Sequence, residues 1–209
     1  MKFDTYFNLL NNFNLNKHGP GFHGDIHLLN VIDHIVNISE NFIETGSNLG
    51  NSLYFIRHNY NIKCFSCEIG DQTPDYLLND NKIVFKKMPS PQFLSHLLIN
   101  FHNINNEVCF FFLDAHSDVA SVWKDELILI IDSFSKYYVI IDDFDVKNEL
   151  FLHNRYEIRD LEFIIKNKNC RVFLPNYNEQ TSEFHKLTGW VLVSNDKSFS
   201  HSNCKEIYL

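Results

Sequence analysis

The sequence predicts an α/β domain built on an open, mostly parallel sheet with helices on both faces. Short apolar runs typical of strands alternate along the chain with segments whose apolar residues recur at helical spacing. Acidic residues stand where several of these apolar runs end. No stretch rich in Pro, Gly or Ser divides the 209 residues, so we expect one domain over 1–209.

Residues 1–40 are expected to form N-terminal helices and a lid, and residues 41–209 the core. Helical spacing covers 1–15 and 26–39, whereas 18–24 contain the Gly and Pro typical of a loop. Three histidines fall in or next to this loop: His18, His23 and His27. They could in principle form a metal site, but a lid that contacts substrate is the interpretation we favour.

Residues 41–68 carry the strongest functional pattern. A strand over 42–44 is followed by a turn with two glycines, a helix over 50–58 and a strand over 63–68. Free backbone N–H groups in such a turn, beside an acid, suit a nucleoside-like ligand. Glu68 comes 24 positions after Glu44, about the separation at which a βαβ unit delivers a carboxylate to ribose hydroxyls.

The rest of the chain continues the alternation of strands and helices. We expect strands over 82–87, 107–113, 137–141, 170–174 and 190–194, and helices over 74–78, 92–101, 122–134 and 155–168. Ligands of open α/β sheets bind in a crevice at the carboxyl ends of the strands. The acids expected there are Glu44, Glu68, Asp114 and Asp142.

Charge and cysteine content exclude several kinds of function. The net charge of −8, with 26 acidic and 18 basic side chains, argues against nucleic acid and anionic membranes as partners. Neither a signal segment nor an apolar run of membrane-spanning length is found, so we expect a cytoplasmic protein. Cys64 and Cys67 have C-x-x-C spacing, but on a strand they point to opposite faces, and we expect buried reduced thiols.

Four short runs, taken in order, resemble the class I S-adenosylmethionine-dependent methyltransferases. They are FIETGSNLGNS at 42–52, SCE at 66–68, LDAHS at 113–117 and IIDDF at 140–144. Within that superfamily the chain is most similar to the small-molecule O-methyltransferase and cephalosporin-hydroxylase-like branches. The resemblance implies a Rossmann-like three-layer α/β/α sandwich, mostly parallel, with a C-terminal antiparallel strand.

The resemblance also implies roles for single residues in binding S-adenosylmethionine. The glycine turn would lie under the methionine part with Glu44 near its amino group, Glu68 would accept hydrogen bonds from the ribose hydroxyls, and Ser90 would approach the adenine edge. The acid that usually stands beside that serine is missing, and Asn48 replaces a glycine of the commoner loop. The candidate cofactor-binding residues are Glu44, Gly46, Ser47, Asn48, Gly50, Ser52, Glu68, Ser90 and Asp114.

A second implication concerns a metal ion and the chemistry. In the metal-dependent O-methyltransferases, oxygen ligands after strands four and five hold Mg²⁺, and here Asp114, Asp142 and Asp143 stand at those positions. Capping of the following helices by Asp114 and Asp142 is the alternative. His116 and Asp114 are the candidate catalytic residues, with His116 as the general base that takes the proton from a substrate hydroxyl. The alternative is that His116 only forms hydrogen bonds.

The function expected from the sequence is therefore methyl transfer to a hydroxyl of a small molecule or sugar. Whether Mg²⁺ assists the transfer and whether the protein forms a homodimer are both left open. Two alternatives remain. One is an inactive cofactor-binding or scaffold domain, and the other is a nicotinamide-dependent oxidoreductase. The latter is disfavoured because the turn has Gly-x-x-x-Gly spacing and lacks the third glycine of the dinucleotide fingerprint.

Overall fold

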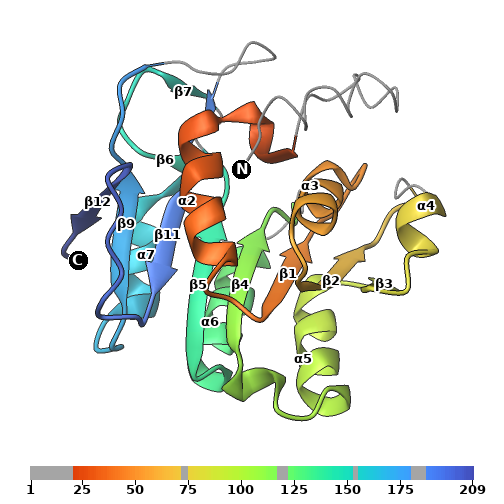
Figure 1. Cartoon of the computed structure of the whole chain (residues 1–209). Coiled ribbons are helices and arrows are strands. Elements are labelled where there is room, and N and C mark those ends of the chain that lie inside the picture. The colour runs from red at the N-terminus through yellow and green to blue at the C-terminus, as the bar shows by residue number, and fades with distance from the viewer. Residues whose placement is uncertain (1–20, 72–74, 117–121, 153–154, 180–186) are drawn as a thin grey trace.

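An eight-stranded sheet forms the centre of the protein in the computed structural model (Figure 1). The structure describes residues 21–71, 75–116, 122–152, 155–179 and 187–209. The helix expected over 1–15 and His18 lie outside these residues. The strand order is β12-β9-β11-β5-β4-β1-β2-β3. The strands are β1 (Asn41–Thr45), β2 (Lys63–Glu68), β3 (Ile83–Lys87), β4 (Val108–Leu113), β5 (Lys136–Ile141), β9 (Arg171–Pro175), β11 (Val191–Ser194) and β12 (Cys204–Ile207).

Strands β1 to β5 run parallel to one another, and the C-terminal strands supply the antiparallel part. β1 pairs with β2 on one side and with β4 on the other. β11 is antiparallel to both β5 and β9, and β12 is antiparallel to β9. The mostly parallel sheet with an antiparallel C-terminal strand is thus confirmed, and the chain reverses its direction across the sheet between β1 and β4, where ligand crevices form.

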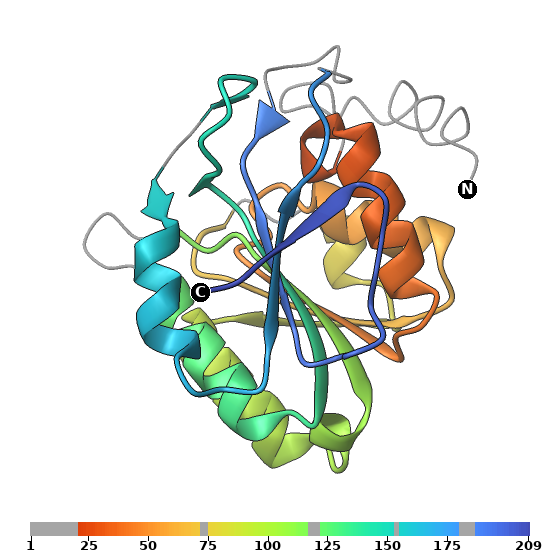
Figure 2. The ribbon, with the colours of Figure 1, turned by 90° about the vertical axis from the view of Figure 1, so that its left-hand side faces the viewer.

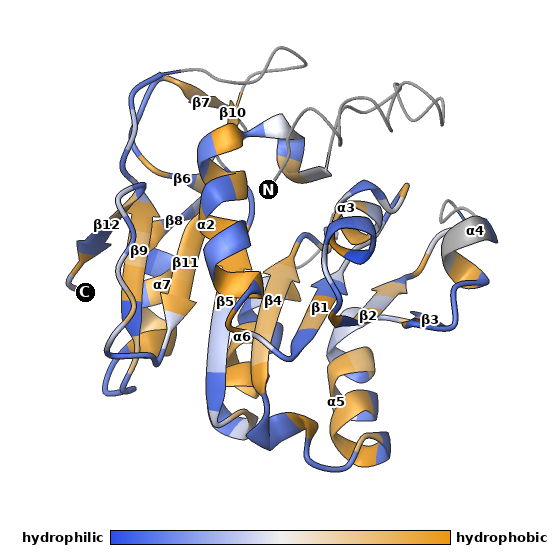
Figure 3. Cartoon of the chain, viewed as in Figure 1, coloured by the Kyte–Doolittle hydropathy of each residue, from blue (hydrophilic) through white to orange (hydrophobic). Residues whose placement is uncertain are grey.

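Helices cover both faces of the sheet, as the two views in Figures 1 and 2 show. Strands β4 and β11 are apolar along most of their length (Figure 3), because side chains on alternate positions pack against both layers. The first face carries the 3₁₀ turn η1 (Gly21–Gly24), α2 (Ile26–Val36) and α3 (Asn51–Asn59), and the second carries α5 (Ser90–Asn100), α6 (Val122–Ser133) and α7 (Ile158–Ile165).

Smaller elements join these layers. Helix α4 (Asp75–Leu78) lies between β2 and β3, and η2 (Ile104–Asn106) precedes β4. Two short parallel pairs lie outside the main sheet. They are β6 (Phe144–Asp145) with β8 (Tyr156–Glu157), and β7 (Phe151–Leu152) with β10 (Leu187–Thr188).

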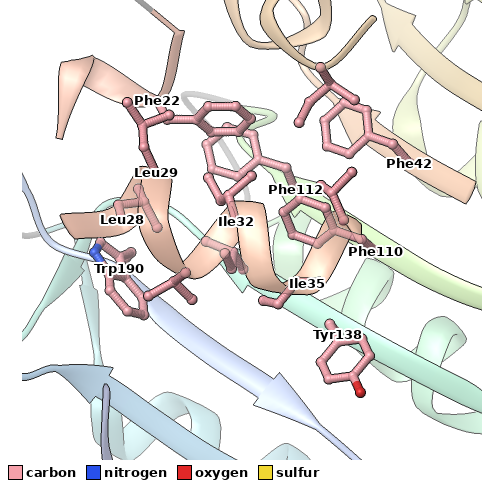
Figure 4. Packing of buried hydrophobic residues seen from close by; sticks show 14 of the residues in the cluster. Phe22, Leu28, Leu29, Ile32, Ile35, Phe42, Phe110, Phe112, Tyr138 and Trp190 are labelled. Atoms are coloured by element: carbon pink, nitrogen blue, oxygen red, sulfur yellow. The ribbon is translucent and has the colours of Figure 1, made fainter. Parts of the chain in front are cut away.

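The segment before β1 is held by the N-cap residue Asp25 and by the buried ring of Phe22. Asp25 caps α2, because its Oδ1 accepts hydrogen bonds from the backbone N–H groups of His27 (3.0 Å) and Leu28 (3.1 Å). Phe22 of η1 is 1% exposed and packs edge-to-face against Phe112 at a ring-centroid distance of 4.8 Å. Figure 4 shows Phe22 reaching from η1 into the core toward Phe112 and Phe42.

Cys64 and Cys67 are buried free thiols, and each belongs to the core of a different face, as expected. Within the described part of the chain, no helix is long and apolar enough to cross a membrane.

Candidate functional site

The turn after β1 packs closely against the backbone that follows β4. Gly46 has a left-handed φ of +79°, and a Cβ added to it would lie 2.5 Å from the carbonyl oxygen of Asp114 and 2.7 Å from the Cα of Ala115. Only glycine tolerates both the conformation and the contact. The glycine turn and the acid after β4 therefore form adjoining walls of one site at the carboxyl ends of the strands.

The backbone N–H groups of Gly46, Ser47 and Gly50 in this turn are not free, contrary to the expectation from the sequence. Those of Gly46 and Ser47 donate to the carbonyl oxygen of Cys67 at 3.0 and 3.2 Å, and that of Gly50 donates to the carbonyl of Ser47 at 2.6 Å. The end of β2 lies beside the turn and takes up these donors. The turn is thus held by β2, and it enters α3 at Gly50 without a side-chain cap.

Glu68, at the end of β2, tethers the same turn. Its Oε2 accepts a hydrogen bond from the N–H of Asn48 at 2.8 Å, and its Oε1 accepts from Ile69 (2.7 Å) and Gly70 (2.9 Å). A carboxylate offers about four lone-pair positions. Three backbone donors therefore leave capacity for a further donor such as a ribose hydroxyl.

Two serines of the expected cofactor site lie at helix starts. The hydroxyl oxygen of Ser52, in the first turn of α3, accepts a hydrogen bond from the N–H of Phe22 at 3.1 Å. Ser90 is the first residue of α5 and is buried. Ser90 lies near Glu126 of α6, whose two carboxylate oxygens have no hydrogen-bond partner in the described part of the chain.

Glu44 points into the interior. It is 2% exposed, and its Oε2 accepts a hydrogen bond from the hydroxyl of Ser66 at 3.1 Å. Burial, followed by the nearby charge of Asp114, raises the pKa of Glu44 to about 8. At neutral pH Glu44 is mostly a neutral carboxylic acid, which weakens the idea that its charge holds the amino group of a cofactor.

Asp114 and Asp142 come together with a histidine from the N-terminal segment. Nε2 of His23 lies 2.7 Å from Oδ2 of Asp142, and ligand atoms of His23, Asp114 and Asp142 all lie within 4.8 Å of one another. Asp142 is 2% exposed, and its Oδ1 has no hydrogen-bond partner in the described part of the chain. A buried carboxylate oxygen without a partner is costly, and a cation would satisfy it.

Asp143 lies beside this group but pairs differently. Its Oδ2 is 3.2 Å from Nε of Arg155 and 3.4 Å from Nε2 of His116. The same His116 nitrogen lies 3.0 Å from Oδ1 of Asp114. His116 therefore connects Asp114, after β4, with Asp143, after β5. The sequence predicted a metal site of Asp114, Asp142 and Asp143, but the three side chains whose ligand atoms lie within 4.8 Å of one another are His23, Asp114 and Asp142.

Burial and the neighbouring carboxylates shift the pKa values of the groups in this cluster. Burial, and then the charge of Asp142, raises the pKa of Asp143 to about 6, and the pKa of Asp114 is raised by the same two causes. Burial acts to lower the pKa of His23, but the charges of Asp142, Asp114 and Asp143 outweigh it and raise this pKa to about 9. The site concentrates negative charge that a cation would neutralise.

The sequence did not identify His23, Arg155 and Glu126 as residues that lie near this site. His23 was placed in a substrate-contacting lid, and Arg155 was read only as the start of a helix. Glu126, in α6, is fully buried, and burial raises its pKa to about 7. It lies three residues after Trp123 on the apolar face of its helix, which was the available signal.

The donor set fits a divalent metal ion, since two carboxylates, of which that of Asp142 is buried, converge with an imidazole and one carboxylate oxygen lacks a partner among the described residues. The region also fits a nucleoside-containing cofactor at Glu68, which keeps acceptor capacity at the end of β2 next to the glycine turn. Glu68, Gly46 and Asp114 line the same end of the sheet. These are the positions at which the sequence placed the site.

The fold resembles solved structures, while no family model and no curated protein matches the sequence. An O-methyltransferase from Bacillus cereus in complex with SAH is 14% identical, with a TM-score of 0.57 over 91% of this chain and 89% of that chain. A SAM-dependent methyltransferase from Anabaena variabilis is 9% identical, with a TM-score of 0.52 over 92% and 91%. A Streptococcus thermophilus protein described as a "putative hemolysin" is 12% identical, with a TM-score of 0.52, and this chain covers 82% of its own length and 66% of that chain. The chain therefore has the Rossmann-like fold of class I S-adenosylmethionine-dependent methyltransferases.

Proposed function

We propose that the protein is an S-adenosylmethionine-dependent methyltransferase that methylates a hydroxyl of a small molecule or sugar with the help of a divalent cation. The observation that carries the proposal is the contact between Gly46 and the Asp114–Ala115 backbone. It brings the turn, which Glu68 holds through the N–H of Asn48, to the end of the sheet where the carboxylates of Asp114 and Asp142 lie. A donor site and an acceptor site must adjoin in this way for direct transfer.

Each of these groups has a task in this reaction. Glu68 would hold the ribose of S-adenosylmethionine, which supplies an electrophilic methyl group. Asp114 and Asp142, with Asp143 beside them, would hold the cation, which lowers the pKa of a coordinated hydroxyl. The remaining work of the protein is to align the acceptor oxygen with the methyl group and to exclude water.

In this proposal His116 takes up the proton of the acceptor. Its Nε2 lies 3.0 Å from Asp114 and 3.4 Å from Asp143, so a proton that it receives is stabilised by two carboxylates. Its hydrogen bond to Asp114 raises the pKa of His116, an effect that its burial opposes. The proton can therefore rest on this imidazole after it leaves the acceptor.

A thermal-shift screen of the full chain tests the proposal. S-adenosylhomocysteine, reduced and oxidised nicotinamide nucleotides, Mg²⁺ and Mn²⁺ are added singly and in pairs. At a hundredfold excess over its dissociation constant, a ligand stabilises the folded state by about 2.7 kcal/mol. We expect S-adenosylhomocysteine to raise the melting temperature and the nicotinamide nucleotides to leave it unchanged. A shift with the nicotinamide nucleotides alone would favour an oxidoreductase, and no shift with any of them would favour a scaffold.

A further inference from the structure

His23 lies at the carboxylate cluster although 119 positions separate it from Asp142. It belongs to η1, where both Phe22 (φ 55°) and His23 (φ 56°) have left-handed backbones. Non-glycine residues adopt this conformation only when their surroundings enforce it. The rest of the segment must therefore hold His23 in place.

Three contacts supply that support. The Phe22 ring is buried against Phe55 and Phe112, at centroid distances of 5.9 and 4.8 Å. The Phe22 N–H donates to the hydroxyl of Ser52. Asp25, which caps α2 immediately after η1, also accepts a hydrogen bond from the hydroxyl of Tyr177. The imidazole of His23 is thus presented to the ends of β4 and β5 by a fixed turn.

The cluster has the composition of a mixed nitrogen and oxygen metal site. One nitrogen of His23 and one oxygen each of Asp114 and Asp142 lie within 4.8 Å of one another. The second oxygen of Asp142 is buried and without a hydrogen-bond partner among the described residues. This unpartnered oxygen is an independent sign that the cluster is completed by a cation.

We propose that His23 is a ligand of this cation, so that the site consists of His23, Asp114 and Asp142 and prefers a first-row transition ion to Mg²⁺. The inference rests on the proposed function, because it identifies the cation of the same site. Imidazole is a ligand for transition ions, whereas Mg²⁺ takes oxygen ligands and retains several waters. The three side chains leave coordination positions for water or the acceptor.

The test measures metal binding, without any assay of activity. The chelator-treated full chain is titrated with Mn²⁺, Co²⁺ and Mg²⁺, and the Mn²⁺ complex is examined by pulsed electron paramagnetic resonance for modulation by a ligand nitrogen. The variant is His23→Asn, because asparagine tolerates a left-handed backbone and removes the imidazole. His27→Asn is the matched control, since His27 lies four residues away and pairs with Glu179.

We expect the wild type to bind Co²⁺ at least about tenfold more tightly than Mg²⁺ and to show nitrogen modulation with Mn²⁺. His23→Asn should lose the modulation and at least about tenfold of Co²⁺ affinity, with a much smaller change for Mg²⁺. His27→Asn should match the wild type, and circular dichroism should show that both variants are folded.

Failure to bind Mn²⁺ or Co²⁺, or nitrogen modulation that persists in folded His23→Asn, would overturn the inference. Persistence would assign the nitrogen to another residue, such as His116. Metal binding through His23 without any binding of S-adenosylhomocysteine would leave this inference standing and refute the proposed function instead.

Discussion

Replacing Gly46 with alanine should destabilise the protein by an amount that the structure allows us to estimate. The added Cβ would lie 2.5 Å from the carbonyl oxygen of Asp114 and 2.7 Å from the N and Cα of Ala115. All three are backbone atoms, so no side chain can rotate away. The left-handed conformation costs alanine about 1–2 kcal/mol, and overpacking adds about 1–3 kcal/mol. The free energy of unfolding should therefore fall by roughly 2–5 kcal/mol.

The assay is urea unfolding followed by far-UV circular dichroism, without added ligand. Gly70→Ala is the matched control, because Gly70 lies just after β2 and is not among the left-handed glycines of the described chain. We expect this control to change stability by less than about 1 kcal/mol. A Gly46→Ala protein as stable as the control would refute the argument that the turn is wedged against β4. Because the cost arises in the ligand-free protein, loss of cofactor binding in this variant would say little about direct contact.

Two further predictions concern the core. Phe22→Ala should lower the free energy of unfolding by about 3–5 kcal/mol, because the ring is fully buried in a cluster of aromatic side chains. Urea unfolding measures this change. A loss below about 1 kcal/mol would show that the Phe22 ring does not anchor η1. Glu126→Gln should change the pH dependence of stability, since burial raises the pKa of Glu126 from 4.5 to about 7. A carboxyl group whose pKa is raised in the folded state stabilises the fold below its unfolded pKa, and this contribution is lost as pH rises through the folded pKa. The Glu126→Gln variant should therefore gain stability relative to the wild type between about pH 5 and pH 8, by at most about 3 kcal/mol. Parallel pH profiles of unfolding for the two proteins would contradict this assignment.

The order and type of the elements follow from local patterns in the sequence. The apolar run at 63–68 coincides with β2 (Lys63–Glu68), and the run at 107–113 coincides with β4 to within one residue. Strand β12 was not expected, because Cys204, Lys205, Glu206 and Ile207 form no apolar run. It lies at the edge of the sheet and pairs with β9 alone, and edge strands commonly carry charged residues.

The glycine turn shows where sequence reasoning reaches its limit. The requirement for glycine at position 46 could be predicted, but its cause could not. The N–H groups of Gly46 and Ser47 bond to Cys67 of the neighbouring strand, and the missing Cβ makes room for the backbone at Asp114. Both contacts depend on how parallel strands lie side by side, which the local pattern does not specify.

The acids of the site could be placed at the strand ends, whereas their partners could not. Asp114 and Asp142 were expected at one site because both stand where strands end, and ligands of open α/β sheets bind at the carboxyl ends of the strands. The contact of Asp142 with His23 joins segments far apart in the chain, and no spacing rule predicts it. The loop at 18–24, with His18 and His23 in it and His27 just after it, marked a region rich in metal-binding side chains, but only the fold brings His23 to the cluster.

Calorimetric titration with S-adenosylhomocysteine tests the central claim most directly. The full chain, Glu68→Gln and Glu107→Gln are compared. The last is a matched control, because Glu107 precedes β4 at the opposite end of the sheet and accepts a hydrogen bond from Asn41. We predict binding of one ligand per chain, weakened at least about tenfold in Glu68→Gln, since a hydrogen bond to a charged group is worth about 1.5–3 kcal/mol, and unchanged in Glu107→Gln. A flat titration of folded wild-type protein, or equal affinity of the wild type and Glu68→Gln, would contradict the account.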